Sequence, residues 1–417
     1  MNSKPLSYDS LKCVILHMEG NKRIELSRRC PSIRLTEKIV PLQVNELGFL
    51  KNGFELNRTK YEIGIHQQYH VGETPNSISR HNEMGGYSTD LDSFGLEDGR
   101  FRNVLTPGDI FIKEDPWEEN NEPLEERIQE LEGNVFEDGA LFFPRDYAQR
   151  NKLIFLRQHH ENAPVPFENV FCLKRSILMG FEKVEFYKYN MNYHQAVKNL
   201  AMLLFGGRLE PINARKMIIQ QSSVIRLPPR LKIKNISEID ILFEPRAVCE
   251  ALSEVFQEPN LLLKRMQLSD PRVEDLTTPI IRNAEYINIF MESAPFHNRE
   301  EEIIDVLTNV ANLEAHFEMN TNELTLQDLL TLVRHWKETE KPIGSLLFMM
   351  FRTKQLCMNR FMDVGKQFDG AHLIEENVVV IPRSIDSSIK LSWSHEQRHA
   401  IWNNDWKLEM KVKAIDQ

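Results

Sequence analysis

Apolar residues recur at helical spacing near the start of the chain. One helix face would carry Leu11, Val14, Ile15 and Met18. This spacing is typical of an amphipathic helix, for which Ser7 or Asp9 is a suitable cap and Gly20 a suitable end. A second short helical run extends from Arg23 to Cys30. Residues 1–36 cannot bury a core of their own, so this helical segment must pack on the next domain or leave part of its stripe for a partner.

Strand and turn signals dominate the next region, residues 37–113. Turn-forming dipeptides occur at Asn52-Gly53, Gly85-Gly86 and Pro107-Gly108, between runs with strand character. The pattern therefore predicts a β-rich middle domain.

From residue 166 to 417, short β-rich runs alternate with helical runs. The β-rich runs are Arg215–Gln220, Glu238–Phe243, Leu263–Leu268, Glu285–Met291 and Leu313–Met319. Their centres lie about 25 residues apart, within the range of leucine-rich-type repeats. The helical runs between them are His194–Phe205, Pro245–Phe256, Arg299–Val310 and Thr325–Thr339. We predict a strand–helix repeat-like domain, built as a solenoid or as an open α/β sheet, so the fold class is α/β (α+β overall).

The strongest helical signal is at Thr325–Thr339. Thr325 and Asp328 have the spacing of a capping box, and an apolar stripe runs from Leu326 to Trp336. A stripe of this kind normally faces a core, so we expect Trp336 to be buried.

Charge is concentrated in one segment. The 417 residues include 51 basic and 61 acidic ones, a net charge of −10. Glu114 to Asp138 contains eleven acidic residues and one basic residue, Arg127, which is also −10, so the rest of the chain balances to zero. We interpret residues 114–165 as an acidic linker. The even balance elsewhere argues against nucleic-acid binding.

The apolar runs and the cysteines of the sequence indicate the cellular compartment. The first twenty residues have no apolar run of signal-peptide length, and no later run reaches the ~20 apolar residues of a membrane helix. The five cysteines are scattered and form no C-x-x-C pair. We expect reduced thiols in a protein of the cytoplasm or nucleus, with no membrane contact.

Several short motifs resemble those of one known family. Pro5 to Leu16, followed by Arg23 and by Leu26 to Ser32, resembles a divergent F-box. Further matching motifs are Val40-Pro41-Leu42, Tyr61-x-x-Gly64-Ile65 and Leu105-Thr106-Pro107-Gly108-Asp109. The chain is similar to a nematode-expanded family in which an F-box-like N-terminus precedes a domain of unknown function and an F-box-associated C-terminal region.

This resemblance implies an adaptor without catalysis or cofactors of its own. It would be a substrate-recognition subunit of an SCF-type ubiquitin ligase, with the SCF adaptor subunit and an unknown protein target as partners. The partner-binding residues would be Pro5, Leu6, Leu11, Val14, Ile15, Met18 and Ile24. The alternative is a ligase-independent binding scaffold whose F-box has decayed.

One catalytic motif supports a third, remote hypothesis. His395-Glu396-Gln397-Arg398-His399 matches the H-E-x-x-H pattern of zinc hydrolases, which need both histidines on one face of a helix. The flanking residues are polar, and the extended pattern fails because Trp402 and Asp405 stand where glycine and histidine are required. The other metal-like patterns are incomplete, so we assign no metal ligand.

Overall fold

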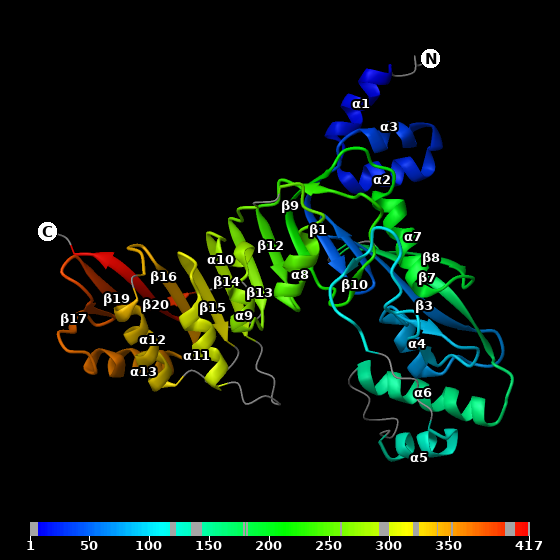
Figure 1. Ribbon diagram of the computed structural model, residues 1–417. Coiled ribbons are helices and arrows are strands. Elements are labelled where there is room, and N and C mark those ends of the chain that lie inside the picture. The colour runs from blue at the N-terminus through cyan, green and yellow to red at the C-terminus, as the bar shows by residue number, and fades with distance from the viewer. Residues whose placement is uncertain are drawn as a thin grey trace. The chain divides into compact units, whose positions relative to one another are not determined.

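The computed structural model describes residues 7–116, 122–134, 144–177, 180, 182–258, 261–291, 300–319, 325–339, 341–351, 353–396 and 405–415 (Figure 1). The fold is mixed α/β. The chain forms two compact units. Unit 1 comprises Met1–Asn235 and Glu254–Gln257, and unit 2 comprises Ile236–Ser253 and Glu258–Gln417. None of the described helices combines the length and apolar character that crossing a membrane requires.

Unit 1 begins with the helical segment that the spacing predicts. Its helices are α1 (Tyr8–His17), α2 (Gly20–Arg29) and α3 (Arg34–Ile39), with one 3₁₀ turn (Pro31–Ile33) before α3. The Ser7 hydroxyl accepts a hydrogen bond from the Ser10 amide at 3.2 Å, which confirms Ser7 as a cap. Gly20 was expected to end the first helix but begins the second. A β-carbon there would lie 3.3 Å from Val44 and 3.4 Å from Leu42, so glycine lets α2 start close to the body without displacing these side chains.

The sheet of unit 1 joins segments that are far apart in sequence. Its strands, in spatial order, are β11 (Ile233–Lys234), β9 (Ile212–Ile219), β1 (Gln43–Leu50), β2 (Gly53–Leu56), β3 (Thr59–Tyr69), β7 (Phe167–Ile177) and β8 (Glu182–Lys188). β9 pairs in parallel with β1 and β11, and the other neighbours are antiparallel. The β-rich region predicted over residues 37–113 therefore does not close on its own; later strands complete its sheet.

The predicted turn at Asn52-Gly53 is confirmed between β1 and β2. A β-carbon on Gly53 would lie 1.9 Å from the Tyr61 carbonyl oxygen, so only glycine fits where this hairpin meets β3.

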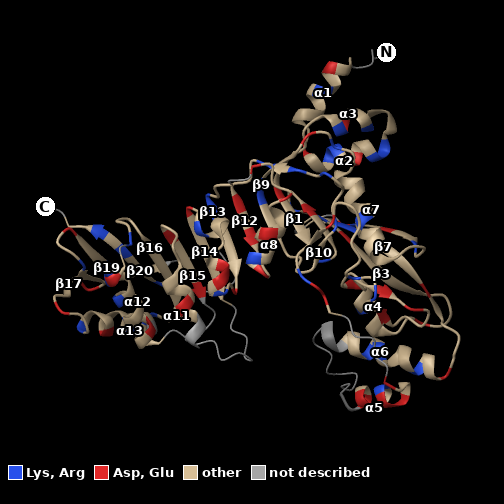
Figure 2. Cartoon of the chain, viewed as in Figure 1, with Lys and Arg blue, Asp and Glu red and all other residues tan. Residues whose placement is uncertain are grey.

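Helices occupy much of the segment predicted to be an acidic linker. They are α5 (Leu124–Asn134) and α6 (Pro144–His160), and the red segments of α5 in Figure 2 mark its acidic residues. α6 contacts α4 (Asn76–Glu83) and buries Leu153, Phe155 and Leu156. Residues 144–160 therefore contribute to the core of unit 1.

Unit 2 confirms the alternation of strands and helices. Its parallel strands are β12 (Glu238–Ile241), β13 (Arg265–Ser269), β14 (Tyr286–Met291), β15 (Glu314–Met319) and β16 (Leu346–Phe351). Four antiparallel strands follow in spatial order: β20 (Asp405–Ala414), β19 (Ser387–Glu396), β18 (Val378–Pro382) and β17 (His372–Glu375). The helices are α8 (Pro245–Leu252), α9 (Val273–Leu276), α10 (Pro279–Arg282), α11 (Glu300–Asn309), α12 (Leu326–Glu338) and α13 (Lys354–Lys366). Of the two predicted arrangements, unit 2 shows the open α/β sheet.

Helix α12 has the predicted capping and burial. Thr325 and Asp328 form a reciprocal capping box, with the Thr325 amide donating to the Asp328 carboxylate at 2.8 Å. Trp336 is only 4% exposed and packs with Leu329, Leu330 and Val333 in the core of unit 2. The expected burial of Trp336 is confirmed.

Candidate functional site

The apolar stripe predicted on α1 divides between the core and the surface. Ile15 is 1% exposed and Val14 is 46% exposed, although they are adjacent in sequence. Leu11 and Met18 are half-buried. Ile24, on α2, is buried. Val14, Leu11 and Met18 therefore remain accessible to a partner, whereas Ile15 and Ile24 serve the protein's own core.

Two of the predicted partner-binding residues, Pro5 and Leu6, lie outside the described residues. Other apolar side chains of the same helices are exposed: Tyr8, Leu16, Leu35 and Ile39. We call Tyr8, Val14, Leu35 and Ile39 the N-terminal apolar surface; Leu16, two positions after Val14, faces the other side of α1. Helices α1 and α3, which carry these residues, contact each other. Single exposed apolar residues are ordinary, but several on one small helical segment are typical of interaction sites.

A buried ion cluster joins these helices to the rest of unit 1. Glu37, at the end of α3, lies 3.3 Å from the Arg23 guanidinium and 2.9 Å from that of Arg208. All three side chains are almost fully buried. Burial lowers the pKa of both arginines, whereas the Glu37 carboxylate raises it. The Lys38 ammonium lies 3.9 Å from the same carboxylate, so three cations share it and the cluster depends strongly on Glu37.

Arg23 also serves as a connector between backbone segments. Its guanidinium donates to the carbonyl oxygens of Pro41 at 2.7 Å, Val40 at 2.8 Å and Glu37 at 3.0 Å. Burial likewise lowers the pKa of nearby Lys38 to about 8. These bonds satisfy the end of α3 and fix its direction relative to β1.

Helix α2 is also bonded to the sheet of unit 1. The Asn21 amide donates to the Leu56 carbonyl at 3.0 Å, and the Tyr61 hydroxyl donates to Asn21 at 2.9 Å. Helices α2 and α3 are therefore fixed by buried polar bonds, and α1 contacts α3 and buries Ile15.

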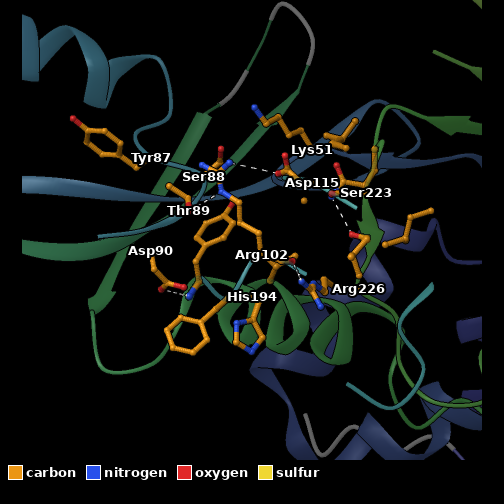
Figure 3. A pocket seen from close by; sticks show the side chains of 18 of the residues that line it. Lys51, Tyr87, Ser88, Thr89, Asp90, Arg102, Asp115, His194, Ser223 and Arg226 are labelled. Carbon is orange, nitrogen blue, oxygen red and sulfur yellow. Dashed lines mark hydrogen bonds and ion pairs between the residues drawn. The ribbon is translucent and has the colours of Figure 1, made fainter. Parts of the chain in front are cut away.

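A polar cavity of about 460 Å³ lies in unit 1 (Figure 3). It is lined by the β1–β2 turn, by the start of α7 (Tyr193–Phe205) and by the short strands β4 (Asp90–Leu91) and β10 (Val224–Ile225). β4 pairs with β5 (Glu97–Asp98), and β10 pairs with β6 (Ile110–Phe111). These small ladders hold otherwise irregular loops around the space.

The arginines of this cavity are already paired. Arg102 extends between Thr89 and Asp115, donating to the Thr89 hydroxyl at 3.2 Å and lying 3.6 Å from Asp115 (Figure 3). Arg226 lies 2.9 Å from Asp109, whose other oxygen is 2.7 Å from the Lys198 ammonium. These pairs connect loops, so both arginines have structural partners.

The remaining titratable groups show no assembled acid–base pair. Burial raises the pKa of Asp90, against the lowering effect of the Tyr193 amide, which donates to it at 2.6 Å. Burial and then Arg226 lower the pKa of His194, so its imidazole is neutral near pH 7. Among the described residues, no hydrogen bond joins His194 to a serine or threonine hydroxyl. The cavity therefore has a polar lining suited to a small polar ligand.

The zinc-hydrolase motif does not have the required geometry. His395 lies in strand β19 (Ser387–Glu396) and not on a helix, and His399 lies outside the described residues. The His395 ring packs 4.8 Å from that of Trp406. Because a catalytic zinc motif of this type needs a helix, this arrangement gives the hypothesis no support.

Two other metal-like patterns are turns or strands, as their composition indicates. The Asp92 carboxylate accepts hydrogen bonds from the amides of Phe94 and Leu96, which closes a turn. His66 lies within β3, and His70 follows the end of that strand. Within the described ranges, no three His, Cys, Asp or Glu residues gather in a way that could hold a metal ion.

Comparison with known protein families gives a match largely in the C-terminal half of the chain. Residues 192–353 match the family model described as "Domain of unknown function (DUF3557)". The match runs from the start of α7 to just beyond β16. It therefore lies C-terminal to residues 37–113, the region predicted to be the β-rich middle domain. No curated protein matches the chain, and no solved structure matches it.

Sequence patterns do not reveal the ion cluster. Arg208 lies 171 positions after Glu37, so no local spacing connects them. The sequence gives one weak indication of the cluster: Arg23 and Glu37 stand among apolar residues of short helices. Charged residues on an exposed helix face have the same pattern, so it does not distinguish the two cases.

Proposed function

We propose that the protein is an interaction adaptor, most specifically a substrate-recognition subunit of an SCF-type ubiquitin ligase. The N-terminal apolar surface would bind the small adaptor subunit of the ligase, and the remainder of the chain would hold a protein target. The protein would carry out no bond chemistry of its own. It would raise the effective concentration of the target near the ubiquitin-transferring enzyme.

The observation that supports this proposal is the division of the α1 stripe. Ile15 anchors the helix in unit 1, while Val14 and its exposed neighbours leave apolar area for another polypeptide. Full burial of such a side chain contributes roughly 1.5–3 kcal/mol, so a few of them suffice for a stable contact. The F-box resemblance of the same residues supports the ligase as the source of the partner.

The direct experiment is co-purification of the full chain with the small SCF adaptor subunit. We expect Val14→Asp to weaken the complex at least about tenfold, because it places a charge in an apolar contact. The matched control is Val71→Asp, a valine of unit 1 that is 63% exposed and lies outside the N-terminal helices. It should leave the complex unchanged.

A ligase-independent scaffold is the second candidate. It uses the same fixed helices and the same exposed residues, and differs only in the partner. If the wild-type chain does not bind the SCF adaptor subunit, the ligase assignment fails and the scaffold takes its place.

A further inference from the structure

Unit 2 has one sheet face that the described helices leave uncovered. Strands β12 to β16 are parallel and adjacent in chain order. Crossovers of this type are right-handed, and successive right-handed crossovers in one direction place all connecting helices on the same face. Consistent with this, α8 contacts α9, α9 contacts α11, α11 contacts α12 and α12 contacts α13, as one layer along the sheet (Figure 1).

The side chains of the two faces differ accordingly. The covered face carries apolar residues such as Met266, Ile289 and Phe317, which are fully or almost fully buried. The opposite face, which we call the open face, carries Tyr286, His316 and Phe348 and extends across β20 and β19. Register fixes this assignment, because Phe348 stands opposite His316 on one side and Glu409 on the other.

An aromatic row crosses the middle of the open face. The Tyr286 hydroxyl and the Nδ1 atom of His316 are 3.1 Å apart, and the rings of His316 and Phe348 meet edge to face at 5.8 Å. The Lys407 ammonium lies 3.9 Å from the centre of the Phe348 ring. These contacts hold the rings in place, and ordered aromatic side chains are favoured at protein interfaces because they lose little entropy on binding.

Lysines lie beside the aromatic row without acidic partners. Lys390 on β19 stands directly opposite Lys411 on β20, and Lys413 follows on the same face. Among the described residues, none of these three ammonium groups has an ion-pair partner. Like charges directly opposite on neighbouring strands destabilise a sheet. The arrangement is therefore unfavourable in the free protein and becomes favourable when a partner supplies negative charge.

We infer that the open face of unit 2 is the target-binding surface, and that it binds a segment of a partner protein with spaced acidic side chains next to apolar ones. The acidic side chains would pair with Lys390, Lys411 and Lys413, and the apolar ones would lie on the aromatic row. This inference rests on the proposed adaptor function and names the class of target. It does not use the N-terminal apolar surface.

The charges of the same face favour a protein segment over a polyanion. Glu314, Glu318 and Glu409 lie on the strands between and beside the aromatic residues, and the whole chain has a net charge of −10. A nucleic acid or an anionic membrane carries closely spaced negative charges that these carboxylates would repel. A peptide can carry acidic side chains opposite the lysines and none opposite the glutamates.

The test is selection of binders to the full chain from a library of random peptides, followed by affinity measurement. We expect the selected peptides to be enriched in Asp and Glu beside aliphatic or aromatic residues. The variant carrying Lys390→Glu, Lys411→Glu and Lys413→Glu should bind them about 30-fold more weakly, since close charge pairs act largely on binding. Peptides with their acids changed to lysine should bind this variant and not the wild type.

The matched control is Lys22→Glu, Lys152→Glu and Lys188→Glu, three exposed lysines of unit 1, which gives the same change in net charge. It should bind the selected peptides as the wild type does. Equal binding of the peptides to both triple variants would overturn the inference, as would selected peptides without acidic enrichment. It would also be overturned if a single-stranded oligoribonucleotide or phosphatidylserine vesicles bound through these lysines while no peptide did.

The two proposals fail separately. Loss of SCF adaptor binding with retained peptide binding removes the ligase and leaves the target surface, whereas the reverse result removes only the target surface.

Discussion

The N-terminal helices and the open face of unit 2 distribute their charges in opposite ways. The helices bury a charged cluster, Arg23, Glu37 and Arg208, and expose apolar side chains such as Val14. Unit 2 buries apolar side chains under its helix layer and displays lysines on the other face. An apolar surface gains affinity from area removed from water, whereas a charged one gains specificity and speed of association. The two surfaces are therefore suited to partners of different kinds.

The buried cluster should have the largest effect on stability. Glu37→Gln leaves two buried guanidinium groups without a countercharge, so we expect a loss of about 3–5 kcal/mol in the free energy of unfolding. Urea denaturation followed by circular dichroism measures it. Glu83→Gln, which removes an exposed ion pair with Arg80, should change stability by less than about 0.5 kcal/mol. Equal effects of the two variants would show that the cluster does not hold the helices.

Acid should destabilise unit 1 through its buried histidines. Burial lowers the pKa of His66 to about 4 and also lowers that of His81. In the unfolded chain both imidazoles become protonated near pH 6.5, whereas in the folded chain they become protonated only at lower pH. Stability should therefore fall as pH decreases from about 6.5 towards 4, by about 1–2 kcal/mol after allowance for the partial exposure of the rings.

The check is unfolding at several pH values, with His66→Gln as the comparison. This variant should lose part of the pH dependence between 4 and 6.5. An unchanged pH profile would mean that His66 does not cause it.

Binding to the two surfaces should differ in its dependence on salt. Raising the ionic strength from low to physiological values should weaken peptide binding to the open face several-fold, because exposed charges are screened over about 10 Å. Binding of the SCF adaptor subunit through the N-terminal apolar surface should change less than about twofold over the same range. Calorimetric titrations at matched salt concentrations measure both, and equal salt dependence would contradict the comparison.

The smallest expected effect is a gain in the stability of unit 2. Lys411→Glu places an opposite charge across from Lys390, so we expect unit 2 to become more stable by about 0.5 kcal/mol while peptide binding weakens. Thermal unfolding of the single variant measures this gain. A loss of stability would indicate that the lysines support the sheet and are not reserved for a partner.

Sequence patterns predicted unit 2 far better than unit 1. The strands β12 to β15 and the helix α12 were predictable because their alternation and capping are local, as Thr325 and Asp328 illustrate. The sheet of unit 1 was not, because β1 pairs with β9, with Phe49 opposite Ile219. The burial of the apolar residues of α1 was predictable only in part. Helical spacing identifies an apolar face, but the packing of the whole unit decides that Ile15 is buried and Val14 exposed.

The account depends most on the N-terminal apolar surface being available to a partner. The most direct measurement is a calorimetric titration of the full chain with the small SCF adaptor subunit, using the wild type, Val14→Asp and Val71→Asp. We predict a one-to-one complex for the wild type and Val71→Asp, with binding at least about tenfold weaker for Val14→Asp at unchanged folding stability. Absence of binding by the wild-type chain, or equal binding by both aspartate variants, would contradict the account.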